Sequence, residues 1–173
     1  MSCEWITRPV PDSLGQTGRA ETSIDHGLTV ESPERRTGSR ERGEPVEVLT
    51  KQPSVKGPPE LFTGDVWFDV IAKGSEPSRV RVNAVHFAPC ARTAWHVHAL
   101  GQTLYVTEGV GFVQARGVPI VRIRPGDVIR IAPREEHWHG ATPSNFMTHL
   151  ALTEGDTVWG EHVTDAEYHS GST

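Results

Sequence analysis

Short stretches of alternating or continuous apolar residues, separated by glycine and proline, follow one another from about residue 66 to residue 154. Runs of this length, rich in valine, isoleucine and aromatic residues, are typical of β-strands, and the closely spaced turn signals favour an antiparallel sandwich or barrel over alternating strands and helices. The only helix expected is a single turn capped by Thr164. The pattern predicts an all-β barrel with strands at 66–72, 79–88, 102–108, 111–117, 120–124, 127–132 and 146–154.

The first 45 residues do not share this pattern. Residues 31–45, ESPERRTGSRERGEP, combine charged residues with Gly, Ser and Pro and show no apolar periodicity. Such a composition cannot bury enough apolar surface to offset the entropy lost on ordering. We therefore expect a disordered N-terminal tail at 1–45 and a folded domain at 46–173.

Composition and charge exclude some classes of function. The net charge of -5 gives no basic surface for nucleic acid or for an acidic membrane, and no apolar run approaches the roughly 20 residues that span a bilayer. The two cysteines suggest no disulfide framework, and the N-terminus lacks the layout of a signal peptide. These features favour a cytoplasmic protein whose partner is a small molecule.

Eight of the nine histidines fall between His86 and His169. His96 and His98 stand two residues apart, and so do His137 and His139. Because residues i and i+2 of a strand point to the same face, each pair can present its imidazoles together. Gln102 points to the same face as His96 and His98 if the segment forms a regular hairpin. A lone His-x-His pair is more often two surface histidines, but two pairs beside turns in one small β domain favour a metal site.

These residues carry a resemblance to the cupin superfamily, which covers about residues 65–155. In the first cupin motif, His96, His98 and Gly109 match, Gln102 replaces the usual glutamate, and Cys90 replaces a glycine. In the second motif, Gly126, Pro133 and His137 match and Arg134 stands where glycine is usual. The resemblance implies a single-domain, antiparallel jelly-roll barrel.

A narrower resemblance concerns the runs TAWHxHxxGQT, PGD, HWHGA and MTHLA. They look like the small bacterial cupins that include the manganese-dependent hydroxynitrile lyases, in which glutamine is a normal ligand. Carried over to this chain, the resemblance implies that the metal ligands are His96, His98, Gln102 and His137. It favours Mn²⁺, while the donor set also suits Fe²⁺, Ni²⁺ and Zn²⁺. Three imidazoles and an amide leave both charges of a divalent ion uncompensated, which strengthens it as a Lewis acid.

The same resemblance implies that His149 is a catalytic acid or base. In the run FMTHLALTE, His149 shares one face with Met147, Ala151 and Thr153, from which it could reach a substrate. The alternative is a core histidine bonded to a neighbouring carbonyl. The lyases carry a glutamine where this chain has the shorter hydroxyl side chain of Thr153, a departure that affects the substrate.

Three functions remain open from the sequence. The first is a metal-dependent lyase of the hydroxynitrile type, in which His149 takes the proton of a cyanohydrin hydroxyl and cyanide leaves. The second is a metal-dependent dioxygenase acting on a small organic substrate, and the third is a cupin that binds a small ligand without turnover. A homodimer is also expected, because Leu61, Phe62 and Trp67 have no obvious place in a core.

Overall fold

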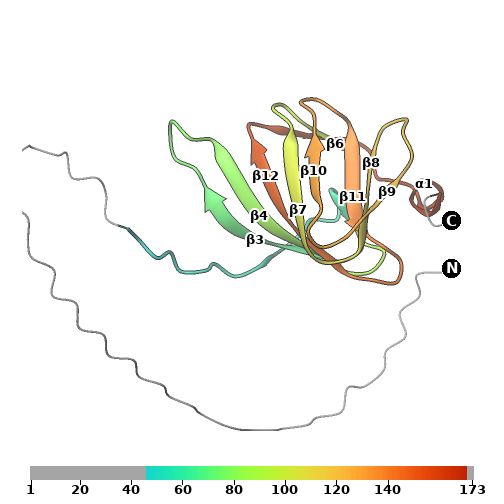
Figure 1. Ribbon diagram of the computed structural model, residues 1–173, viewed down its shortest axis with the longest axis horizontal. Coiled ribbons are helices and arrows are strands. Elements are labelled where there is room, and N and C mark those ends of the chain that lie inside the picture. The colour runs from blue at the N-terminus through green and yellow to red at the C-terminus, as the bar shows by residue number, and fades with distance from the viewer. Residues whose placement is uncertain (1–45, 171–173) are drawn as a thin grey trace, which may run out of the picture. The chain divides into compact units, whose positions relative to one another are not determined.

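The protein folds as two curled antiparallel sheets. A computed structural model describes residues 46–170, so the predicted tail at 1–45 lies outside the described residues. One sheet contains, in order, β1 (Val55–Lys56), β3 (Val66–Lys73), β4 (Val80–Phe87), β12 (Met147–Glu154), β7 (Gln102–Gly109) and β10 (Val128–Ile131). Figure 1 shows β3, β4, β12, β7 and β10 running side by side.

The second sheet completes the barrel. Its order is β13 (Thr157–Trp159), β6 (His96–His98), β11 (His137–Ala141), β5 (Arg92–Thr93) and β2 (Phe62–Thr63). β8 (Gly111–Ala115) pairs with β11, and β9 (Val121–Ile123) pairs with β8. The prediction of an all-β barrel is confirmed, and each of the seven predicted strands forms within a few residues of its expected limits.

The alternation along β7 shows how the sequence forms this sheet. Leu104 and Val106 are fully buried in the core, whereas Tyr105 and Thr107, which alternate with them, are exposed. Burying a side chain of this size stabilises the fold by about 1.5–3 kcal/mol. At the end of β7, Gly109 has a φ of 72°, and a Cβ there would collide with the Phe146 carbonyl. Glycine is therefore required at this position.

One expectation about the site strands is wrong. The sequence suggested a hairpin that carries His96, His98 and Gln102 on one face. Instead β6 and β7 do not pair, because β6 lies in one sheet and β7 lies in the other. Gly101, with a φ of 86°, lies in the turn between them. Gln102 therefore comes from the sheet opposite the two histidines.

The C-terminal turn packs beside the second sheet. α1 (Asp165–His169) begins at Thr164, whose side chain accepts from the Glu167 amide in a capping box, which confirms the expected cap. Tyr168 is fully buried and donates a hydrogen bond to the Ala141 carbonyl at 2.6 Å. It packs with Phe112 and Trp138 in a core cluster of their own. Within residues 46–170, no helix has the length and apolar character needed to cross a membrane.

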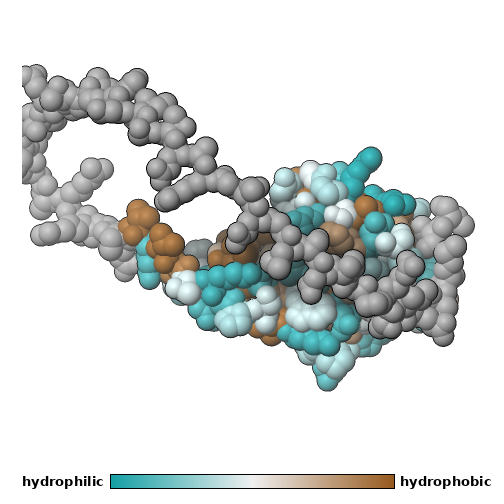
Figure 2. All heavy atoms as spheres, turned by 90° about the horizontal axis from the view of Figure 1, so that it is seen from below, coloured by the Kyte–Doolittle hydropathy of each residue, from teal (hydrophilic) through white to brown (hydrophobic). Residues whose placement is uncertain are grey.

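The residues expected at a dimer interface divide between two environments. Leu61 and Phe62 are half-buried and lie in the wall of a cavity, whereas Trp67 is exposed on the outer side of β3. Tyr105 and Leu152 are exposed on the same outer sheet face. Figure 2 shows hydrophilic residues over much of the described surface on one side, with hydrophobic residues in separate areas.

Candidate metal centre

His96 and His137 lie opposite each other in the β6–β11 pairing, and both are buried. The Nδ1 atom of His96 is 3.0 Å from the Ala94 carbonyl, and that of His137 is 2.8 Å from the Glu135 carbonyl. A carbonyl oxygen only accepts hydrogen bonds, so each Nδ1 carries the hydrogen and each Nε2 keeps its lone pair. This is the tautomer that a metal-ligating histidine needs.

His98 and Gln102 complete the predicted set. The Nδ1 atom of His98 lies 2.9 Å from the Thr157 hydroxyl, while its Nε2 atom is buried without a hydrogen-bond partner among residues 46–170. Gln102 Oε1 lies 3.1 Å from His137 Nε2. The structure thus brings all four predicted ligands into one region of the barrel interior.

His139 also belongs to this cluster. One ligand atom each from His96, His137 and His139 lie within 4.8 Å of one another, and the His139 Nε2 atom has no hydrogen-bond partner among the described residues. A buried polar atom without a partner is costly, and a divalent ion bound to the Nε2 atom of His98 or of His139 would remove that cost at the histidine that binds it. The donors therefore fit a metal ion, and the group that meets within 4.8 Å contains His139 in place of the predicted His98.

The electrostatics keep these imidazoles neutral. Burial lowers the pKa of His96 well below its usual range, and nearby His137 lowers it further. Burial also lowers the pKa of His98 to about 4 and that of His137, although the hydrogen bond to the Glu135 carbonyl partly opposes the shift at His137. Neutral imidazoles at neutral pH are the form that binds a metal.

His149 lies behind His139 and not at the cavity wall. It is fully buried on β12, its Nε2 atom is 3.1 Å from His139 Nδ1, and its ring packs against Phe87. Burial lowers the pKa of His149 to about 4. His139 itself lines the cavity. A second imidazole is thus a partner of His149, and His139 connects His149 to the cavity.

A cavity of about 590 Å³ opens beside the histidines. Its size is that of a small-molecule site. His96, His98, Gln102 and His139 line it, and Phe62, Phe68 and Trp159 add apolar walls. Trp159 stacks on His96 with ring centroids 4.7 Å apart. The arrangement could hold an apolar molecule with its polar end at the histidine cluster.

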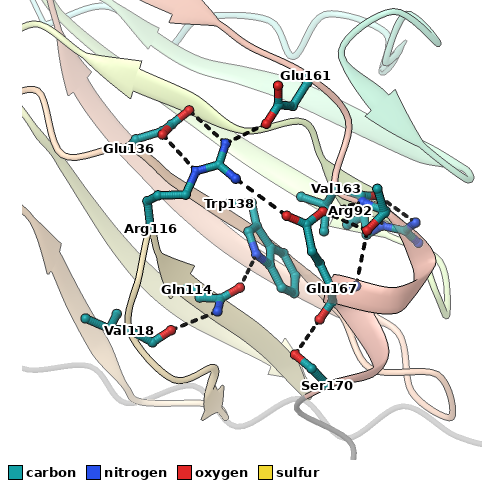
Figure 3. Close-up of polar contacts among 11 residues, drawn as sticks. Arg92, Gln114, Arg116, Val118, Glu136, Trp138, Glu161, Val163, Glu167 and Ser170 are labelled. Atoms are coloured by element: carbon teal, nitrogen blue, oxygen red, sulfur yellow. Dashed lines mark hydrogen bonds and ion pairs between the residues drawn. The ribbon is translucent and has the colours of Figure 1, made fainter.

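A network of charged residues supports the strands that carry the ligands (Figure 3). The Arg116 guanidinium bonds to Glu136 at 2.9 and 3.1 Å, to Glu161 at 2.8 Å and to Glu167 at 3.5 Å. It also stacks on the Trp95 ring at 3.8 Å. Trp95 and Glu136 directly precede His96 and His137 in the chain. The network therefore fixes the backbone next to two predicted ligands and ties both to α1.

The two departures from cupin glycines occur at strained backbone positions. Cys90 has a φ of 68° and Arg134 has a φ of 61°, both in the left-handed region that favours glycine. The Arg134 amide donates to the His98 carbonyl at 2.9 Å. The turn thus adopts the left-handed backbone that glycine favours, although Arg134 carries a side chain.

Sequence reasoning missed several residues of the cavity. Arg81 and Asn83 line it from β4, and Trp159 lines it from β13. Arg81 and Asn83 are spaced by two residues from each other and from the apolar Val85, so the sequence could have placed all three on the same face of the strand. Trp159 carried no comparable signal, because β13 has only three residues. Two further histidines make ordinary hydrogen bonds, His86 to Thr148 and His162 to Thr63.

Comparison with known proteins agrees with this fold. A family model described as a cupin domain matches residues 83–158. The chain is 50% identical over 121 residues to an (R)-mandelonitrile lyase of Granulicella tundricola, covering 68% of this chain and 92% of the relative. The barrel and its histidine motifs define a cupin, and the chain belongs to the cupin family.

Solved structures show the same fold. A cupin-like protein from Thermotoga maritima superposes with a TM-score of 0.67 at 36% identity, covering 72% of this chain and 96% of that one. A cupin-2 domain protein from Rhodospirillum rubrum superposes with a TM-score of 0.53 at 16% identity, covering 72% and 85%. The second likeness concerns the fold alone.

Proposed function

We propose that this cupin is a metal-dependent lyase that cleaves hydroxynitriles into a carbonyl compound and hydrogen cyanide. The observation that carries the proposal is the set of three buried imidazoles whose Nδ1 atoms are held by protein oxygens, beside the Gln102 amide. The likeness to a relative named (R)-mandelonitrile lyase supports the choice of reaction.

The proposed ligands are His96, His98, Gln102 and His137, and the proposed metal is Mn²⁺. His98 is preferred to His139 because the Thr157 hydroxyl anchors His98 Nδ1, whereas His139 Nδ1 meets the imidazole of His149. A bound divalent ion would supply Lewis acidity at the substrate oxygen. Since all four donors are neutral, the protein would not weaken that acidity.

His149 and His139 form the proposed proton-accepting pair. His139 lines the cavity, and His149 contacts it at 3.1 Å from the buried side. The pair accepts the proton of the substrate hydroxyl. The carbonyl forms as the bond to the nitrile carbon breaks with its electron pair on cyanide, and cyanide leaves as hydrogen cyanide after taking up that proton. The apolar walls hold the remainder of the substrate and exclude water.

The test is cleavage of racemic mandelonitrile by protein loaded with Mn²⁺, measured with and without dioxygen. We expect benzaldehyde and cyanide to form at equal rates in both atmospheres and to stop after chelation. Activity that needs dioxygen would indicate the oxygenase instead. Binding without turnover under either atmosphere would indicate a ligand-binding cupin.

We further propose that the protein is a cytoplasmic homodimer. Trp67, Tyr105 and Leu152 are exposed on the outer face of the β1–β10 sheet, where a second copy would cover them. Light scattering at micromolar concentration should give a dimer mass. Substitution of Tyr105 by glutamate should lower it toward that of a monomer, and a wild-type monomer would contradict the proposal.

A further inference from the structure

Arg81, Thr153 and Gln102 lie in one row across three neighbouring strands. In the register of the sheet, Thr153 of β12 is opposite Arg81 of β4 on one side and opposite Gln102 of β7 on the other. All three residues line the cavity. Neighbouring strands are about 4.8 Å apart, so the Arg81 backbone lies roughly 10 Å from that of Gln102. A small molecule at the histidine cluster can therefore also contact Arg81.

The charge of this row is unusual for an apolar cavity. Within residues 46–170, Arg81 is the one arginine or lysine that lines the cavity, and it forms no ion pair with another residue of that range. Asp156, which is exposed, also lines the cavity without pairing with Arg81. Asn83 and Thr153 add amide and hydroxyl donors beside Arg81. Arg81, which is exposed, thus contributes a positive charge to the cavity wall among hydrogen-bond donors.

We propose that Arg81 binds a carboxylate of the substrate, and that the substrates of this cupin carry that carboxylate at the end remote from the reacting hydroxyl. The planar guanidinium matches a carboxylate with two parallel hydrogen bonds. Phe68 and Trp159 form apolar walls of the same cavity and suit an aromatic or aliphatic spacer between the two ends. The inference rests on the proposed function only in taking this cavity as the substrate site.

The experiment compares three ligands by calorimetry on the full chain with Mn²⁺ added. The probes are 4-(hydroxymethyl)benzoate, its neutral counterpart 4-(hydroxymethyl)benzamide, and benzyl alcohol. We expect the benzoate to bind about tenfold more tightly than the benzamide, as a charge-assisted hydrogen bond implies. Arg81→Gln should bind the two ligands within about twofold, and Arg81→Lys should keep part of the preference because the charge remains.

Arg79 provides the matched control, since it lies two residues away, is exposed and does not line the cavity. Arg79→Gln should retain the full preference. Equal binding of benzoate and benzamide by the wild type would overturn the proposal, as would a preference that survives in Arg81→Gln or is lost in Arg79→Gln. Cleavage of mandelonitrile and of its 4-carboxylate derivative, measured in parallel, separates the two proposals. A carboxylate preference without cleavage of either cyanohydrin would support Arg81 as the carboxylate site and reject the lyase. Cleavage without the preference would support the lyase and reject the role of Arg81.

Discussion

Metal binding at about pH 6 should release fewer protons from this protein than from three imidazoles with ordinary pKa values. An imidazole with the ordinary pKa of about 6.5 is about three-quarters protonated there, so three such ligands would lose more than two protons on binding a metal. Burial instead holds the pKa of His98 at about 4 and those of His96 and His137 below their usual range. His98 would then be protonated in about one molecule in a hundred.

The proton count is measured by titrating Mn²⁺ in two buffers of different ionisation enthalpy, because the difference in observed heat gives the protons released. Gln102→Glu provides the contrast. Its carboxylate would lie close to His137 Nε2, which is 3.1 Å from the present amide oxygen, and would stabilise the charged imidazole. This variant should release about one proton. Release of two or more protons by the wild type would refute the reasoning that burial keeps the ligands neutral.

Three further predictions concern single substitutions. His98→Ala should lose most bound manganese while His139→Ala retains it, as measured by metal analysis after dialysis. The reverse result would show that His139, and not His98, is the ligand. His149→Ala should keep the metal but lower the rate of mandelonitrile cleavage by about 10²–10⁴, and an unchanged rate would exclude His149 from proton transfer. Arg134→Gly should raise the free energy of unfolding by about 1 kcal/mol in urea, because Arg134 holds a positive φ, and a decrease would show that its side chain stabilises the turn.

The sequence predicted the long strands well because their period-two alternation records which face is buried. Strands such as β5 and β13, with two or three residues, carry too few positions for any period to be visible. Their pairings depend on residues distant in the chain, as when Thr157 lies opposite His98. The same limit explains why Trp159 could not be assigned to the site from the sequence.

The types of residue at the site could be predicted from the sequence, but their positions relative to one another could not. The spacing of His96 and His98 indicated a shared face, and this survives in β6. The position of Gln102 depended on a turn at Gly101 that crosses between sheets, which local parity cannot show. For His149, alternation gave the correct face, but whether it meets the cavity or a second histidine depends on β11, a different part of the chain.

The origin of the proposed ligands in both sheets has a consequence for how long the folded protein survives. His96, His98 and His137 belong to one sheet and Gln102 to the other, so a bound ion would join the two sheets of the barrel. A ligand that binds only the folded chain adds about 2.7 kcal/mol of stability at a concentration of 100 times its Kd. Starving a cell of the metal would then shorten the lifetime of the protein itself, and its abundance would follow the metal supply even at constant synthesis.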